Sequence, residues 1–306
     1  MRRQGERARG AAAQLPAGSD APSDGRVGTV IQVVLYRSQQ WVPGLVASLN
    51  QLEPGPAPFQ VAFWNNAPGD GTTEQIRRAR PRFTYTVVDA PDGNIGFGAA
   101  HNRLATAGPP AQHLLLLNPD TLIFYDCLTR LLAAARTCPT AGLLEAAQFP
   151  IEHPKVYEAA TGHTNWCAAT CLLVPRALFV ELGGFDPALF LYCEDVDLSW
   201  RVWLRGRSCL YVPPAKCAHL TRENETGKEP LLEVRQSWIG HLYLRRKFFG
   251  AEALAEGMAM MRRRLPPAEV ATVLQAFAQL PATVHRNPGH PRVQLTADGN
   301  YAPTRW

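Results

Sequence analysis

The chain has 306 residues, of which 46% are hydrophobic and 19% are charged, and its formal net charge is +5. This length is enough for one large α/β domain or two smaller ones. The modest positive charge alone would allow a nucleic-acid partner, but no basic stripe with interleaved aromatic residues accompanies it, so we expect no nucleic-acid binding.

The N-terminal residues 1–26 are rich in Gly, Ala, Pro, Arg and Ser and are predicted to be disordered. After them, strand-like and helix-like patterns alternate. This alternation predicts an α/β fold with a mainly parallel sheet flanked by helices. The expected strands are 29–36, 61–64, 83–90 and 113–118, and the expected helices are 41–52, 73–80 and 99–108.

From about residue 150 the pattern loosens. We expect a strand at 171–174, an acidic helix from residue 194 that stops at Gly206, a C-terminal helical stretch and an extended, mobile tail. The seven cysteines are predicted to be free thiols, because no apolar leader precedes them. No apolar run reaches the roughly 20 residues that span a bilayer, so we expect a cytoplasmic chain without a membrane span.

In a parallel sheet, ligands bind outside the carboxyl ends of the strands. Polar residues stand at several of these predicted ends, namely Tyr36-Arg37, Asn65-Asn66, Asp89 to Asn94 and Asn118 to Asp120. Two of these stretches contain residues suited to binding a ligand. The stretch DGNIGFGAAHN (92–102) puts glycines before a helix, which suits either a diphosphate or an ordinary turn. In LLLLNPDT (114–121), Asp120 follows a buried strand and is either a metal ligand or a turn residue.

The helix from residue 194 begins with Glu194, Asp195 and Asp197, directly after the apolar run 188–192. Acids in a first turn suit the helix dipole, and Asp197 is spaced to pair with Arg201. Capping explains one or two of the acids. It does not explain why all three follow an apolar run, because acids beside buried apolar surface cost free energy unless they are paired, capped or used.

The segments NNAPGDGT, NIGFGAAHN, LLLLNPDT, GGFDPALFLYCEDVDLSWR and a later Ala218-His219 occur in this order. The set resembles the family-2 glycosyltransferases with a GT-A fold, closest to the rhamnosyltransferase-like branch. The resemblance implies a glycosyltransferase domain at 27–249, with a nucleotide-sugar half (27–125) and an acceptor half (126–222). A C-terminal helix and extended tail (250–306) would follow.

The resemblance also implies site residues. Asp195 would be the general base of an inverting transfer, and Asp120 and His219 would hold a divalent cation, Mg²⁺ or Mn²⁺. The donor-binding residues would be Tyr36, Asn65, Asn94, Gly96, Gly98 and Asn118. The acceptor-site residues would be Trp166, Asp186, Glu194 and Asp197. The partners would be a dTDP- or UDP-sugar and a glycan or lipid-linked acceptor.

Three positions depart from the family pattern. Asn65 and Arg37 stand where Asp and Asn are usual, and Ala169 stands where Gly is frequent. The first two leave room for a non-catalytic sugar-nucleotide-binding protein. A sugar-phosphate nucleotidyltransferase is disfavoured, because YRSQQWVPG lacks the expected glycine-rich, lysine-bearing loop.

The C-terminal region is basic, and two interpretations remain open for it. Its arginines and lysine lie among aromatic residues, at Arg235, Arg245, Arg246, Lys247 and 262–264. A peripheral contact with the inner face of an anionic membrane is one interpretation. A helix that packs its aromatics against the domain is the favoured one.

Overall fold

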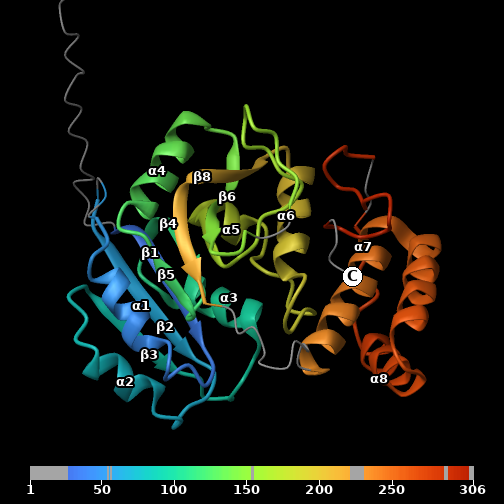
Figure 1. Cartoon of the computed structure of the whole chain (residues 1–306), viewed down its shortest axis with the longest axis horizontal. Helices are drawn as coiled ribbons and strands as arrows, with labels where there is room; N and C mark the ends of the chain where they lie inside the picture. Colours follow the sequence, from blue (N-terminus) through green and yellow to red (C-terminus); the bar gives the residue numbers. More distant parts are fainter. Residues whose placement is uncertain are drawn as a thin grey trace, which may run out of the picture.

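The computed structural model describes residues 27–53, 55, 57–152, 155–220, 231–285 and 289–302. The predicted disorder of residues 1–26 lies outside this part of the chain. The fold is mixed α/β, with a sheet of eight strands in the order β3-β2-β1-β4-β7-β6-β8-β5 (Figure 1). The strands are β1 Val27–Leu35, β2 Phe59–Asn65, β3 Tyr85–Asp89, β4 Ala111–Leu117, β5 Thr121–Ile123, β6 Ala141–Phe149, β7 Cys171–Pro175 and β8 Ser208–His219.

The sheet consists of two parts joined at one antiparallel pair. β3, β2, β1 and β4 run parallel, so their carboxyl ends lie at one edge. β7 runs antiparallel to both β4 and β6, and β6 pairs with β8 in parallel. β5 pairs antiparallel with β8, with Thr121 opposite His219. That pairing places the end of β8 beside the turn that follows β4.

Helices cover both faces of the sheet. They are α1 Val42–Leu49, α2 Thr72–Arg78, α3 Phe97–Ala107, α4 Cys127–Thr137, α5 Arg176–Glu181, α6 Glu194–Leu204, α7 Leu231–Arg264 and α8 Pro267–Ala278. α1, α2 and α4 contribute to one core cluster, and α3, α5 and α6 contribute to the other. A third cluster lies between α7 and α8, beside the main domain (Figure 1).

The strands and helices expected up to residue 118 are all present. α6 ends as predicted, with Gly206 at a φ of 74°. The region after residue 120 is more regular than its sequence pattern indicates, because β5, α4 and β6 occupy much of 121–149. β6 was missed because its sequence, AGLLEAAQF, lacks the β-branched residues that mark β1.

The expectation of an extended, mobile tail is wrong for residues 289–302. Val293, Tyr301 and Ala302 are buried in the same core cluster as α6, and the carbonyl of Gly299 accepts a hydrogen bond from the Arg245 guanidinium. This packing could not be predicted from the sequence, because single apolar residues among Gly and Pro residues show neither the helical nor the strand periodicity.

All seven cysteines are free, as expected. Within the described residues, no helix combines the length and the apolar character needed to cross a bilayer.

Candidate functional site

Asp120 and His219 lie together, as the sequence predicts. Asp120 follows β4, His219 ends β8, and the Nε2 atom of His219 is 3.4 Å from Oδ1 of Asp120. The other ring nitrogen, Nδ1, is 2.9 Å from Oε1 of Gln148 on β6. A neutral imidazole that donates from Nδ1 presents the Nε2 lone pair to the carboxylate, which is the arrangement of a histidine prepared for a metal ion.

These two side chains fit a divalent cation that takes further ligands from a bound molecule. Nearby in the sequence, the buried Oδ1 atom of Asn118 has no hydrogen-bond partner. The described residues contain no group of three or more His, Cys, Asp or Glu side chains arranged to hold a metal ion. If a cation binds here, Asp120 and His219 would be its ligands from the protein, and oxygen atoms of a bound molecule would supply the others.

The segment Ala168–Thr170 connects this end of β4 to the predicted base. The Thr170 carbonyl accepts a hydrogen bond from the Asn118 N–H at 2.9 Å. The N–H of Ala169 donates to Oδ2 of Asp195 at 3.3 Å, and the N–H of Val196 donates to its Oδ1 at 2.8 Å. Asp195 is partly exposed at the start of α6. Backbone donors stabilise a carboxylate in its ionised form, which is the form a general base needs.

Glu194, next to Asp195, has a different environment. It is 5% exposed, and its Oε2 atom has no hydrogen-bond partner. Burial raises the pKa of Glu194 well above its usual value, and the negative charge of Asp195 adds to this effect. Burial therefore favours the protonated form of Glu194, whereas the backbone N–H groups at Asp195 favour its ionised form.

Asp186 and Asp197 meet at one buried lysine. Nζ of Lys247, on α7, contacts Oδ2 of Asp186 at 2.6 Å and also binds Oδ1 of Asp197. Asp197 pairs with Arg201 at 2.7 Å, as predicted from their spacing. Tyr243 donates a hydrogen bond to Asp186. Asp186, in the loop before α6, and Asp197, on α6, are therefore both connected to α7 through Lys247. Sequence reasoning missed Lys247, which stands in a basic run resembling any exposed one.

The glycine loop packs against the acceptor loop. Gly96 has a φ of 90°, and a Cβ atom there would lie 2.5 Å from the Phe190 carbonyl oxygen. A Cβ on Gly98 would lie 2.7 Å from Cβ of Phe185. Asn94 accepts a hydrogen bond from the Gly96 N–H at 3.0 Å. These contacts account for both glycines without a ligand, and the donor-binding role of the loop stays a prediction.

Asn65, at the end of β2, is 1% exposed. Its amide nitrogen donates to Oδ1 of Asp89 at 3.0 Å, and its Oδ1 accepts from the N–H of Ala67 at 3.0 Å. Asp89, which accepts this hydrogen bond, is exposed at the same edge of the sheet. Asp89 is therefore a candidate donor-binding residue, although the sequence pattern identified it only as one of several polar residues at strand ends. Tyr36 is 48% exposed at the end of β1, where the Arg37 guanidinium lies 5.3 Å from its ring centroid.

Trp166 is buried rather than open to solvent. Its ring meets Tyr301 edge-on at 5.5 Å between centroids, and Nζ of Lys155 lies 4.5 Å from the ring centroid. Trp166 therefore packs within the core beside Tyr301 and Lys155, and its acceptor-site role stays a prediction.

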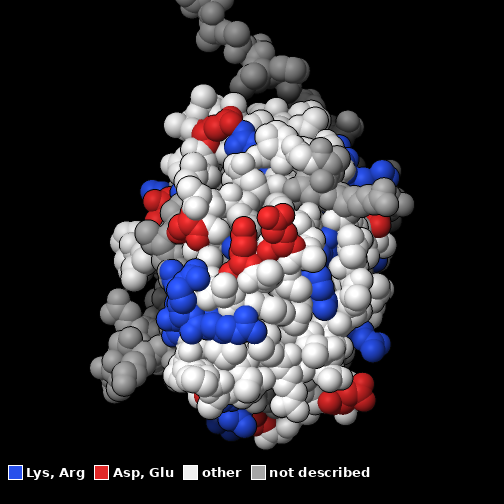
Figure 2. Space-filling model, turned by 90° about the vertical axis from the view of Figure 1, so that its right-hand side faces the viewer, with Lys and Arg blue, Asp and Glu red and all other residues white. Residues whose placement is uncertain are grey.

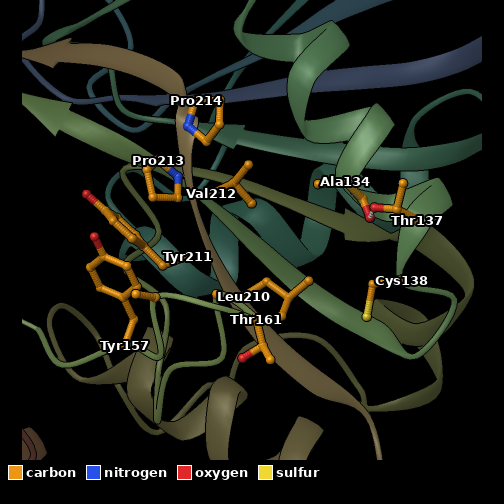
Figure 3. A pocket seen from close by; sticks show the side chains of 12 residues that line it. Ala134, Thr137, Cys138, Tyr157, Thr161, Leu210, Tyr211, Val212, Pro213 and Pro214 are labelled. Atoms are coloured by element: carbon orange, nitrogen blue, oxygen red, sulfur yellow. Dashed lines mark hydrogen bonds between the residues drawn. The ribbon is translucent and has the colours of Figure 1, made fainter.

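A pocket of about 220 Å³ lies elsewhere, between the end of α4 and β8 (Figure 3). Tyr157 and Tyr211 stand side by side at its rim, with ring centroids 4.7 Å apart. Its lining contains none of the predicted site residues, so the catalytic groups do not open into it.

Comparison with known proteins supports a carbohydrate enzyme, although no family model matches the chain. The N-acetylglucosaminyl-diphospho-decaprenol L-rhamnosyltransferase of Mycobacterium tuberculosis H37Rv is 28% identical, over 56% of this chain and 70% of that protein.

Solved structures share the fold at lower identity. Residues 1–349 of Staphylococcus aureus TarS, in complex with UDP-GlcNAc, match 82% of this chain and 72% of theirs, with a TM-score of 0.57 and 16% identity. The Pyrobaculum calidifontis mannosyltransferase PcManGT, in complex with GDP-Man and Mn²⁺, matches 83% of this chain and 81% of its own, with a TM-score of 0.54 and 15% identity. This chain spans 43% of a longer TarS structure.

Proposed function

Because this chain is a glycosyltransferase with the GT-A fold and resembles the family-2 rhamnosyltransferases, we propose that it performs an inverting transfer from a nucleotide-diphosphate sugar. The acceptor is a hydroxyl group of a glycan or a lipid-linked sugar. The transferred sugar is rhamnose, from a dTDP donor, in line with the activity in the name of the mycobacterial relative.

One observation carries the proposal. Asn118, in the turn before Asp120, is hydrogen-bonded to Thr170, and Asp195, at the start of α6, is hydrogen-bonded to Ala169. Ala169 and Thr170 are consecutive residues. The proposed base and the turn that leads to Asp120 are thus hydrogen-bonded to the same segment of backbone. An inverting transfer needs two functions held in a fixed arrangement, namely a base on the acceptor side and charge neutralisation on the leaving-group side.

In the proposed step, the acceptor oxygen attacks the anomeric carbon while Asp195 takes its proton. The bond from that carbon to the diphosphate oxygen breaks, and the nucleoside diphosphate leaves with the electron pair. Asp195 keeps its ionised form through the N–H groups of Ala169 and Val196. Glu194, which holds its own proton, does not compete for that of the acceptor. Asp120 and His219 would hold a divalent cation, which would supply positive charge to neutralise the departing diphosphate.

The division into a donor half (27–125) and an acceptor half (126–222) is part of the proposal. The parallel strands β1 to β4 fall in the first half, and α6 with β8 falls in the second. The donor-side residues are Tyr36, Asn65, Asn94, Gly96, Gly98 and Asn118, and Asp89 joins them at the edge of the sheet.

A peripheral membrane contact would have to use few of the C-terminal cations. Arg245 and Lys247 are buried, and Arg235 pairs with Glu269 at 2.6 Å. The favoured interpretation, a helix packed on the domain, accounts for these residues. The exposed run 262–264 is left for an anionic surface. Figure 2 shows acidic side chains between groups of basic ones on this face, a mixture that weakens attraction to anionic lipid.

The first test is a thermal-shift screen of dTDP, UDP, GDP and CDP, each with and without Mn²⁺. A nucleotide at about a hundred times its dissociation constant should stabilise the fold by about 2.7 kcal/mol. We expect a shift that depends on the base and on the metal, and that Asp120→Ala abolishes. The absence of a shift with every nucleotide would favour a scaffold protein without a donor site.

The second test measures release of dTDP from dTDP-rhamnose in the presence of a synthetic N-acetylglucosaminyl-diphospho-polyprenol. Asp195→Asn should lower the rate by about 10²–10⁴-fold, the usual contribution of a general base, without changing the nucleotide-induced thermal shift. Glu181→Gln, at an exposed ion pair, is the matched control. Transfer at the wild-type rate by Asp195→Asn would remove Asp195 from the mechanism.

A further inference from the structure

A second buried lysine lies behind the catalytic helix. Lys155, in the connection after β6, forms an ion pair with Glu145 on β6, and their side chains are 1% and 0% exposed. The lysine ammonium also lies 4.5 Å from the ring centroid of Trp166 and 5.7 Å from that of Tyr211. Removing two charges from water is costly, so a buried ion pair is weak evidence for stability alone and calls for another role.

The ion pair reaches Asp195 through adjacent peptide groups. Oε2 of Glu145 accepts the N–H of Ala168 at 2.7 Å, and the next N–H, that of Ala169, donates to Oδ2 of Asp195 at 3.3 Å. The two N–H groups belong to neighbouring peptide planes that are joined at the buried residue Ala168, so a displacement of one plane moves the other unless the φ and ψ angles of Ala168 change. A shift of Glu145 is therefore passed to the hydrogen bond that holds Asp195.

We propose that the buried Lys155–Glu145 ion pair positions the Asp195 carboxylate through the consecutive N–H groups of Ala168 and Ala169. Lys155 holds the Glu145 side chain, Glu145 holds the Ala168 amide, and the Ala169 amide orients the base toward the acceptor. Both residues are positioning residues, since neither touches substrate. The inference rests on the proposed role of Asp195 as the base.

The pair also shapes the charge around Asp195. Beyond the effect of burial, the charge of Asp195 raises the pKa of Glu194 on the same helix and of Glu145 on β6, so both acids lie near it. Lys155 is the cation paired with Glu145, and Arg201 on α6 and Lys247 on α7 are those paired with Asp197. Asp197 is neutralised by Arg201 and Lys247. Burial raises the pKa of Glu145, and the Lys155 ammonium opposes that rise. Removing the Glu145 charge while Lys155 remains would leave a buried cation near the base.

The positioning role is tested by comparing two uncharged double variants. Glu145→Gln with Lys155→Met keeps an oxygen that can accept the Ala168 N–H, and Glu145→Leu with Lys155→Met removes it. We expect kcat for dTDP release from dTDP-rhamnose with the N-acetylglucosaminyl-diphospho-polyprenol to be about 10- to 100-fold lower in the leucine variant, because small misplacements of catalytic groups have effects of this size. The KM for dTDP-rhamnose and the nucleotide-induced thermal shift should be equal in the two.

A second measurement does not depend on activity. The ¹³C signal of the Asp195 side-chain carboxyl, in protein labelled at aspartate Cγ and assigned through Asp195→Asn, reports its titration without substrate. In Glu145→Gln alone, the unpaired Lys155 cation should move the titration midpoint of Asp195 to lower pH. The double variant Glu145→Gln with Lys155→Met should return it to near the wild-type value, and Glu181→Gln should leave it unchanged.

The outcomes separate this inference from the proposed function. Equal kcat values for the double variants, or an Asp195 midpoint unmoved in Glu145→Gln, would overturn the positioning role. If wild-type protein releases no dTDP, the proposed activity fails, and the carboxyl titration still decides whether the ion pair controls Asp195. If Asp195→Asn is fully active, the base assignment fails, and the positioning role for catalysis fails with it.

Discussion

Four acids lie within or beside the first turn of α6, and each has a different environment. Glu145 is paired with Lys155, Asp197 is paired with Arg201 and Lys247, and Glu194 is buried without a partner at Oε2. Asp195 is partly exposed and bound by backbone N–H groups. Acids whose environments differ in this way separate in protonation, and that separation is how a site obtains one ionised base among several carboxyl groups.

Glu194 should destabilise the protein as pH rises. Because its pKa is raised in the folded state, the folded chain keeps a proton that the unfolded chain releases, so stability falls between the ordinary pKa and the raised one. Glu194→Gln should therefore match wild type near pH 4 and be more stable at pH 7, by about 1.4 kcal/mol per unit of the pKa shift. Urea unfolding at the two pH values measures this. A Glu181→Gln control should show no such difference with pH.

Gly96 should be far less replaceable than Gly69. Both have positive φ, but a Cβ at Gly96 would lie 2.5 Å from the Phe190 carbonyl oxygen, whereas nothing lies within 4 Å of one at Gly69. Gly69→Ala should cost about 1–2 kcal/mol of unfolding free energy, the strain of the left-handed conformation. Gly96→Ala should cost more than about 3 kcal/mol, since a backbone atom must also move. If urea unfolding gave the same loss of unfolding free energy for both variants, the backbone at Phe190 would be able to move away without strain.

At the scale of elements, buried ion pairs connect α7 to α6. Lys247 joins α7 to Asp197 on α6 and to Asp186 on the loop before it. The Lys247 hydrogen bond lowers the pKa of Asp186 although burial opposes this. α7 is therefore a structural support of the site and not an appendage to the domain.

Lys247→Met should lower the unfolding free energy by about 3 kcal/mol at pH 7, because it leaves buried carboxylates without their cation. The depressed pKa of Asp186 contributes stability above the ordinary aspartate pKa, and this is lost as pH falls through the folded-state pKa. The deficit of the variant should therefore shrink below about pH 4. Arg262→Met, at an exposed site in the helical segment of α7 that follows the non-helical Gly250, is the control for replacing a cation by methionine in a helix. A deficit that stays constant with pH would argue against the carboxylate partners.

Sequence patterns predicted the elements better than their long-range contacts. The β-branched run of β1 and the leucines of β4 identify buried strands, and the motif order placed Asp120 and His219 together correctly. Lys155 and Lys247 could not be recognised, because a lysine that will be buried looks the same in sequence as one that will be exposed. Their partners lie 10 to 61 residues away. Such pairings depend on the folded topology, which no local period encodes.

At the scale of the whole molecule, buried histidines should make the protein sensitive to acid. Burial lowers the pKa of His101 to about 3, and burial together with the nearby Arg245 charge lowers that of His241 to about 3. The folded state therefore binds fewer protons than the unfolded state below about pH 6.5, so stability falls as pH decreases.

We expect a loss of about 2 kcal/mol of unfolding free energy per histidine between pH 7 and pH 5. Urea unfolding at pH 7 and pH 5 measures this by difference: His101→Asn should lose about 2 kcal/mol less than the wild type over this range. His163→Gln, at a less buried position, should show the same pH dependence as the wild type. An equal pH dependence of His101→Asn and the wild type would mean that the His101 ring is hydrated or opens readily.

The antiparallel seam between β4 and β7 has a consequence for recombination between related enzymes. The parallel strands β3, β2, β1 and β4, which belong to the proposed donor half, meet the rest of the sheet through the five register pairs from His113–Pro175 to Leu117–Cys171. A chimaera joined here would exchange nucleotide preference while retaining α6 intact. Its success would depend on Asn102, whose side chain exchanges hydrogen bonds with the backbone of Phe185 across the joint. A donor half without an asparagine at position 102 would leave the backbone N–H and carbonyl of Phe185 without these hydrogen bonds. The first chimaera to make would therefore carry asparagine at this position.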